Sequence, residues 1–484
     1  MDDLKAKGIK AFAWDYSGQL ATQGMGLIVS IFLARLLEPS EFGLIAMIMV
    51  IIGIASVFTD IGLGSALIQR RKVLPVHYSS VFYFNIFIGL ILTLITYFSA
   101  SWIGAFYNND ALVLLAQVMS LSFLINAFSS VQSTKLRKEL DYGALTKSRF
   151  MASLLSGGAG VALAFYGAGV WSLVTQVLSF SIFYNIMIWS TSQWKPSLSF
   201  SFKALAQLWA YGFRMFLSGL LDAVFTRLDY LIIGKLFTPA TLGFFQRAKS
   251  LNLMVVQYSS GSLMRVLFPI LSEVQNDLQR LQRIAIKAMG IICFIVFLLL
   301  GGLYLISEEL ILLLFGDKWI QSVSYFQILV ISGFGYPVGA LLVNILSSRG
   351  KSKEFLRLEL LKKALISINF FVLYNWGISS YLYGLIVTTV LAVILNIFFA
   401  SREISLPMVR FIKPIIIQAS ISIIAIVTTE YLLKSTDLSA ISKLILEGLT
   451  FTTIYLLINW TFKTSSFYAF LEQLLPVVKQ RFGK

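Results

Sequence analysis

The sequence predicts an all-α polytopic membrane protein with about fourteen transmembrane helices, which contain two structural repeats in tandem. Three observations lead to this fold class: the composition, the spacing of the apolar runs, and a motif that occurs twice. Of the 484 residues, 57% are hydrophobic and 13% are charged, and the mean hydropathy is +0.81. Soluble domains are much less apolar, so we expect the chain to lie in a membrane.

An apolar run needs roughly 20 residues to cross the hydrocarbon core of a bilayer as a helix. The first run follows Lys5, Lys7 and Lys10 and imitates a signal peptide, but it is too long and lacks a cleavage site, so we expect a retained helix. The predicted spans are 11–36, 42–68, 78–103, 112–132, 150–166, 170–190, 212–236, 242–266, 286–306, 322–346, 364–376, 382–400, 414–433 and 444–462.

A motif at the end of the first run recurs 200 residues later, as ARLLEPSEFGLI at 34–45 and GKLFTPATLGFF at 234–245. Four pairs of residues match at this offset: Arg35 with Lys235, Leu36 with Leu236, Pro39 with Pro239, and Gly43 with Gly243. In both copies the proline ends one helix and pre-sets a turn before the next. Each copy is therefore expected to form a hairpin between two membrane helices.

Later matches support two tandem repeats, with an offset that grows to between 210 and 215 residues. They are Lys138-Glu139-Leu140 with Lys353-Glu354-Phe355, and Gly167 with Gly377. A longer connection after the eighth run would explain the growth. The repeats divide the chain into an N-lobe at 1–200, a C-lobe at 201–405, and two further helices with a cytoplasmic tail at 406–484.

The basic residues predict the orientation of the chain in the membrane. Of the 39 Lys and Arg residues, 30 lie on one side of the predicted membrane, five lie on the other, and four lie inside spans. Positive residues collect on the cytoplasmic side, so both termini are expected in the cytoplasm. The net charge of +16 belongs to this topology, because no soluble stretch is long enough to bind nucleic acid.

The first and seventh spans carry polar stripes on one helix face. Such a stripe in lipid either lines a hydrophilic cavity or makes hydrogen bonds between helices. Arg227 points away from the second stripe and is expected to bind a ligand or to pair with a carboxylate on another helix. The stripe residues are Asp15, Gln19, Thr22, Gln23, Gly26 and Ser30 in the first span, and Arg214, Ser218, Asp222 and Asp229 in the seventh.

The eighth span places Arg247 and Lys249 where the first repeat has Met47 and Met49. Cations concentrated inside a span suit an anionic ligand such as a phosphate; the alternative is a structural role. In the second span, Asp60 precedes two glycines in FTDIGLGSAL. It is expected either to bind a coupling cation or proton, or to cap an unwound helix turn.

Two other features are not expected to form sites. Gly350-Lys351-Ser352 is similar to the end of a phosphate-binding loop, but Ile345 stands where its first glycine should be. The single histidine, His77, is expected at the surface, without the partners that a metal site needs. The single cysteine, Cys293, has no partner for an internal disulfide. We therefore expect no metal, nucleotide or other cofactor.

Three stretches resemble polysaccharide exporters of the multidrug/oligosaccharidyl-lipid/polysaccharide superfamily, and most closely the colanic-acid and teichuronic-acid exporter branch. They are IFLARLLEPSEFGLI at 31–45, FTDIGLGSALIQR at 58–70 and LDYLIIGKLFTPATLGFFQRAKSL at 228–251. The resemblance implies two pseudo-symmetric six-helix lobes followed by two C-terminal helices, a fold like that of MATE transporters and lipid II flippases. It also implies export of undecaprenyl-pyrophosphate-linked oligosaccharide across the bacterial plasma membrane. Lipid II flippases bind the pyrophosphate with arginines on their first helices, whereas this first span has Gln19 and Gln23 before Arg35.

Three other function classes are weighed against the flippase. A structural scaffold for a cell-envelope complex would leave the buried charges unexplained. A drug/cation antiporter of the same superfamily should present carboxylates and aromatic rings, rather than cations, to its ligand. A membrane glycosyltransferase or polymerase needs a catalytic constellation that the short outward loops do not provide. We therefore expect a transporter rather than an enzyme. Its expected partners are the lipid-linked oligosaccharide, the bilayer, a polymerase and other envelope assembly proteins, and a coupling proton or sodium ion.

Overall fold

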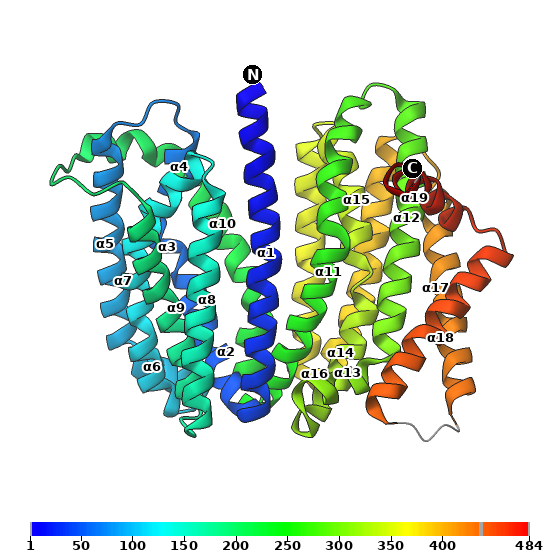
Figure 1. The fold of residues 1–484 in the computed structure, drawn as a ribbon, viewed down its shortest axis with the longest axis horizontal. Coiled ribbons are helices and arrows are strands. Elements are labelled where there is room, and N and C mark those ends of the chain that lie inside the picture. Colours follow the sequence, from blue (N-terminus) through cyan, green and yellow to red (C-terminus); the bar gives the residue numbers. More distant parts are fainter. Residues whose placement is uncertain (1, 435–438, 483–484) are drawn as a thin grey trace. The chain divides into compact units, whose positions relative to one another are not determined.

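The computed structural model describes residues 2–434 and 439–482, and their side chains outside 2–13, 255–266 and 474–482. In this part of the chain every regular element is helical, which confirms the all-α prediction (Figure 1). The helices are α1 Asp2–Leu36, α2 Pro39–Ala55, α3 Val57–Asp60, α4 Leu63–Gln69, α5 Pro75–Phe98, α6 Ala100–Tyr107, α7 Ala111–Lys138, α8 Tyr142–Phe165, α9 Val170–Thr191, α10 Phe202–Leu236, α11 Pro239–Glu273, α12 Leu278–Leu305, α13 Ser307–Phe315, α14 Ile320–Ser332, α15 Gly335–Ser348, α16 Ser352–Glu403, α17 Val409–Leu433, α18 Ala440–Thr461 and α19 Ser465–Phe482, with a 3₁₀ turn η1 at Asp317–Trp319.

Among the described residues, 11 helical segments are long and apolar enough to cross a membrane. The protein is therefore a multi-pass membrane protein. The 35-residue helix α10 is not among these segments, because charged residues such as Arg214 and Asp222 lower its hydropathy. Helix α11 is not counted, because its side chains at 255–266 lie outside those that the structure describes. Helix α16 is counted as one of the 11 segments, although Gly377 interrupts its helical backbone with a φ of 84°. The number of fourteen spans stays a prediction.

The chain forms two compact units, which we call unit 1 (Met1–Gln246) and unit 2 (Arg247–Lys484). In unit 1, α8 packs against α1 and α9, α5 packs against α7, and α10 packs against α2 and α4. In unit 2, α15 packs against α16, and α12 packs against α17 and α19. Helix α10, the first span of the predicted C-lobe, thus packs within unit 1. The division at 1–200, 201–405 and 406–484 stays a prediction.

The helix ends follow the predicted repeat. Helix α1 ends at Leu36 and α10 ends at Leu236, and the next helices begin at Pro39 and Pro239. Both prolines occupy the first helical position, where their fixed φ suits the helix and no N–H is missed. The duplicated motif is therefore one hairpin used twice, as its sequence predicts.

One later match needs a correction. Gly167 and Gly377 have positive φ angles of 75° and 84°, and they lie 210 residues apart. At the same offset, Lys138 at the end of α7 matches Ser348 at the end of α15. Lys353 instead lies in the first turn of α16. Matching Lys138 with Lys353 was therefore wrong. Lys138 ends the helix before one connection, whereas Lys353 lies in the helix that follows the corresponding connection.

The histidine prediction is also wrong. His77 is only 3% exposed, because it lies in the first turn of α5 and caps that turn. The Leu74 N–H donates to His77 Nδ1 at 3.1 Å, and His77 Nε2 lies 3.2 Å from Gln207 Oε1 on α10. Since Nδ1 accepts, Nε2 carries the proton and donates to the amide oxygen. The neutral ring therefore links α5 to α10.

Unit 2 contains a buried polar network between α12, α17 and α18. The Tyr455 hydroxyl lies 2.5 Å from Gln418 Oε1 and 3.0 Å from the Phe294 carbonyl oxygen. Gln418 Nε2 donates to Asn459 Oδ1 at 2.9 Å. Polar side chains within a membrane bundle pair across helices in this way because lipid offers them no partner. The network holds the two C-terminal spans to the rest of unit 2.

Candidate transport site

The polar stripe of α1 flanks the face with which this helix packs. Gly18 packs against Thr146, and Val29 packs against Gly157 on α8. Gln19 and Gln23 are exposed within unit 1, and Asp15 is half-buried. Gln19 Nε2 donates to Asp15 Oδ2 at 3.0 Å. The stripe therefore does not form the α1–α8 packing face.

The stripe of α10 divides into exposed and buried residues. Arg214 and Asp222 are exposed within unit 1. Asp229 is 8% exposed, and its Oδ1 accepts the Tyr230 N–H at 2.9 Å. Arg214 lies in the N-terminal half of α10, Asp222 lies just after its midpoint, and the buried carboxylate of Asp229 lies near its end.

Arg227 lies against a glycine of α2. Its Nη1 donates to the Met49 carbonyl oxygen at 3.1 Å. A Cβ at Gly53 would collide with the guanidinium, so the missing side chain of Gly53 makes room for this cation. The partner of Arg227 is thus a backbone carbonyl rather than the carboxylate that was one sequence expectation. One bond leaves most of its five N–H donors available for a further ligand.

Arg247 and Lys249 lie together on α11 in unit 2, but in different surroundings. Arg247 is 7% exposed, and its guanidinium carbon lies 4.7 Å and 5.0 Å from the ring centroids of Phe315 and Trp319. Two aromatic faces stabilise a buried cation electrostatically. Lys249 is half-buried. The aromatic pair, four residues apart, is the signal that the sequence analysis missed.

Asp60 caps the break between α3 and α4. Ile61 and Gly62 have positive φ angles of 43° and 71°, and both carboxylate oxygens of Asp60 accept the Gly64 N–H, at 3.0 and 3.1 Å. Asn85 Nδ2 donates to Asp60 Oδ1 at 3.3 Å. The predicted capping arrangement is therefore present at the start of α4.

The environment of Asp60 also contains an unsatisfied acceptor. Asn85 Nδ2 lies 3.1 Å from Ser130 Oγ, but Asn85 Oδ1 has no hydrogen-bond partner, although the residue is fully buried.

At the other end of α4, Lys138 Nζ donates to the Leu67 carbonyl oxygen at 2.5 Å. Helix α4 is thus held at both ends by charged side chains.

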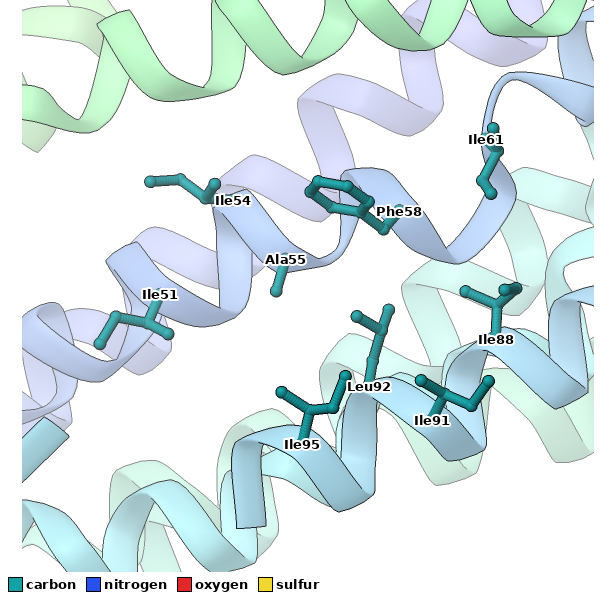
Figure 2. Close-up of a pocket in the computed structure, with 9 residues that line it drawn as sticks. All are labelled: Ile51, Ile54, Ala55, Phe58, Ile61, Ile88, Ile91, Leu92 and Ile95. Atoms are coloured by element: carbon teal, nitrogen blue, oxygen red, sulfur yellow. The ribbon is translucent and has the colours of Figure 1, made fainter. Parts of the chain in front are cut away.

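Unit 1 also contains an apolar groove between α2, α3 and α5 (Figure 2). Its volume is about 520 Å³. Its lining residues are Ile51, Ile54, Ala55, Phe58, Ile61, Ile88, Ile91, Leu92 and Ile95. None of them can hydrogen-bond a sugar or a phosphate through its side chain. This groove therefore suits hydrocarbon, and none of the polar residues described above is among its lining residues.

Comparison with known proteins identifies the family. The family described as "Polysaccharide biosynthesis protein" matches residues 32–324, which is more than half of the chain. The chain belongs to this polysaccharide biosynthesis family. One relative is the lipopolysaccharide biosynthesis protein WzxC of Escherichia coli K12, with 24% identity over 70% of each chain. Another is the teichuronic acid biosynthesis protein TuaB of Bacillus subtilis 168, with 26% identity over 58% of each chain.

Solved structures place this family member in a known fold. The lipid II flippase MurJ in its inward closed conformation matches with a TM-score of 0.72 and 16% identity, covering 93% of this chain and 99% of that one. A multidrug resistance MATE family transporter of the MOP superfamily matches with a TM-score of 0.61 and 15% identity, covering 79% and 94%. The predicted likeness to MATE transporters and lipid II flippases is confirmed for the fold.

Proposed function

We propose that this protein is a flippase that moves undecaprenyl-pyrophosphate-linked oligosaccharide repeat units across the bacterial plasma membrane by alternating access, for cell-surface polysaccharide synthesis. One observation carries the proposal: a chain of the polysaccharide biosynthesis family has a flippase fold over 93% of its length. A sugar–diphosphate headgroup is too polar to cross roughly 30 Å of hydrocarbon unaided. The lipid tail can stay in the bilayer while the protein carries the headgroup.

Each unit offers cationic side chains that would bind pyrophosphate: Arg214 and Arg227 in unit 1, and Lys249 and Arg247 in unit 2. Arg214 is exposed, and Arg227 uses one donor on the Met49 carbonyl, so both can offer charge-assisted hydrogen bonds to phosphate oxygens. Half-buried Lys249 can act as a mobile point charge. For Arg247, the two ring contacts support anchoring of α11 as an alternative to phosphate binding.

The α1 amides would bind the sugar. Gln19 and Gln23 are exposed, and each amide group can both donate to and accept from hydroxyl groups. Neutral amides bind sugars without holding them by charge, which suits a ligand that must leave again. Gln19 is oriented by the bond that it donates to Asp15.

Carboxylates would couple transport to a proton or sodium gradient. Asp60 is the favoured candidate, because it joins two helix segments at a break and lies beside the unsatisfied Asn85 oxygen. A cation or proton there would change the charge that caps α4. Asp15, Asp222 and Asp229 are further candidates. Cytoplasmic termini and association with a polymerase or other envelope proteins are part of the same proposal.

Complementation tests the function. The gene is expressed in a strain that lacks its own exporter, and surface polysaccharide is measured by sugar analysis alongside the amount of protein in the membrane. Restored glycan export is the expected result. Correctly inserted protein that restores no export of any lipid-linked glycan offered, but lowers drug accumulation in the cells, would favour the antiporter and refute the proposal.

A further inference from the structure

The two copies of the duplicated motif are each other's packing partners. Both lie within unit 1, at the starts of α2 and α11. A Cβ on Gly43 would collide with the carbonyl oxygen of Pro239, and a Cβ on Gly243 would collide with the carbonyl oxygen of Pro39. The contact is therefore reciprocal across the 200-residue repeat. We call these four residues the Pro–Gly crossing.

The crossing explains why the motif keeps both residues. Each glycine lies four residues after its proline, so the two stand on neighbouring turns of one helix face. A hydrogen on the glycine Cα takes the place of the side chain and points at the carbonyl of the other copy. Small residues spaced in this way let membrane helices approach backbone to backbone. Any other L residue would push the two helices apart.

The crossing is sterically tight but energetically weak. Cα–H contacts to carbonyl oxygens are weak hydrogen bonds, and none of the four residues carries a charge. A contact of this kind excludes solvent when it is formed and costs little to separate. Helix α11 starts in unit 1 and continues into unit 2 after Gln246.

We propose that the Pro–Gly crossing closes the transport path at the ends of α1 and α10, and that it separates and re-forms in each transport cycle. This inference rests on the proposed function. Gly43 and Gly243 are then the residues that permit the closed state, and a methyl group at either position holds the path open. A path that cannot close at this end cannot complete the cycle.

Alanine substitutions test whether the closed state needs glycine at positions 43 and 243, and matched glycines elsewhere serve as controls. Gly24 and Gly158 also lie within helices, but a Cβ on either would meet nothing within 4 Å. Gly43→Ala and Gly243→Ala are expected to lower glycan export at least tenfold at normal protein levels, whereas Gly24→Ala and Gly158→Ala leave it unchanged. Wild-type export by both motif variants would overturn the proposal.

A reversible crosslink tests whether the Pro–Gly crossing must separate during transport. In a Cys293→Ala background, Ser40→Cys and Ala240→Cys place thiols one residue after each proline, to be joined by a cleavable bifunctional maleimide. Crosslinking is expected to stop export, and cleavage is expected to restore it, while either single cysteine variant has no effect. Normal export by fully crosslinked protein, or failure of the pair to crosslink, would overturn the proposal.

The two proposals fail in distinguishable ways. If the unmodified protein exports no glycan, the proposed function is refuted. The crossing is still tested then by the crosslinking yield in membranes, which Gly43→Ala should lower at least tenfold and Gly158→Ala should not change. If the unmodified protein exports glycan but crosslinking or methyl groups have no effect, only the crossing proposal is refuted.

Discussion

Arg227 gives the most direct test of how this protein holds a phosphate. Arg227→Gln removes the cation but keeps a polar side chain beside Gly53. The single charge-assisted bond to the Met49 carbonyl contributes about 1.5–3 kcal/mol to folding, and the substitution also removes the partly buried charge, so the fold should tolerate its loss. A charge-assisted bond to phosphate contributes about 1.5–3 kcal/mol, and each 1.36 kcal/mol changes a rate about tenfold. Export should therefore fall about 10-fold to 150-fold.

Gly53→Ala provides the matched perturbation, because its new methyl group collides with the Arg227 guanidinium and displaces the charge without removing it. We expect a smaller loss of export than for Arg227→Gln, and none for Gly158→Ala, which adds a methyl group in open space. The assay is glycan export per protein molecule in an exporter-deficient strain. Wild-type export by well-inserted Arg227→Gln would refute a phosphate-binding role.

Three further results are expected. Arg247→Ala removes two ring contacts, each contributing up to about 2 kcal/mol when buried, so the purified protein should unfold at a lower temperature; unchanged stability with lost export would favour phosphate binding instead. Tyr455→Phe leaves the Gln418 amide oxygen without its 2.5 Å partner and should cost about 1–2 kcal/mol by thermal unfolding; an unchanged midpoint would contradict this. Reporter fusions at Lys10 and Lys484 should both give cytoplasmic signals, and an outward signal from either would break the predicted topology.

The positions of the helix breaks were predictable because they depend on local chemistry. Proline is favoured in the first turn of a helix and disfavoured in its interior, so Pro39 and Pro239 predicted the starts of the second helices of the two hairpins. Gly377 adopts a positive φ that few other residues tolerate, and it separates the two predicted spans within α16. The duplicated motif also predicted the repeat, although not that its two copies would touch. That contact depends on tertiary packing, which one sequence does not reveal.

The partners of the charged residues were not predictable for the same reason. Nothing near Arg227 in sequence indicates that Gly53 makes room for it, and the rings over Arg247 lie about seventy residues later. Residue type and periodicity identify a buried cation but not whether a carbonyl, an aromatic ring or a ligand faces it. The Asp60 cap was predictable as an alternative, because an aspartate before two glycines is a common end of a helix turn.

The measurement that tests the central claim most directly is flipping of a lipid-linked oligosaccharide by the purified protein. The protein is reconstituted into vesicles that contain an undecaprenyl-pyrophosphate oligosaccharide in both leaflets, and a membrane-impermeant glycan-oxidising reagent is added outside. A flippase should expose the inner-leaflet glycan to the reagent over time, and Arg227→Gln should slow this exposure. If vesicles with wild-type protein protect the inner-leaflet glycan as well as protein-free vesicles do, across imposed proton and sodium gradients, the account is contradicted.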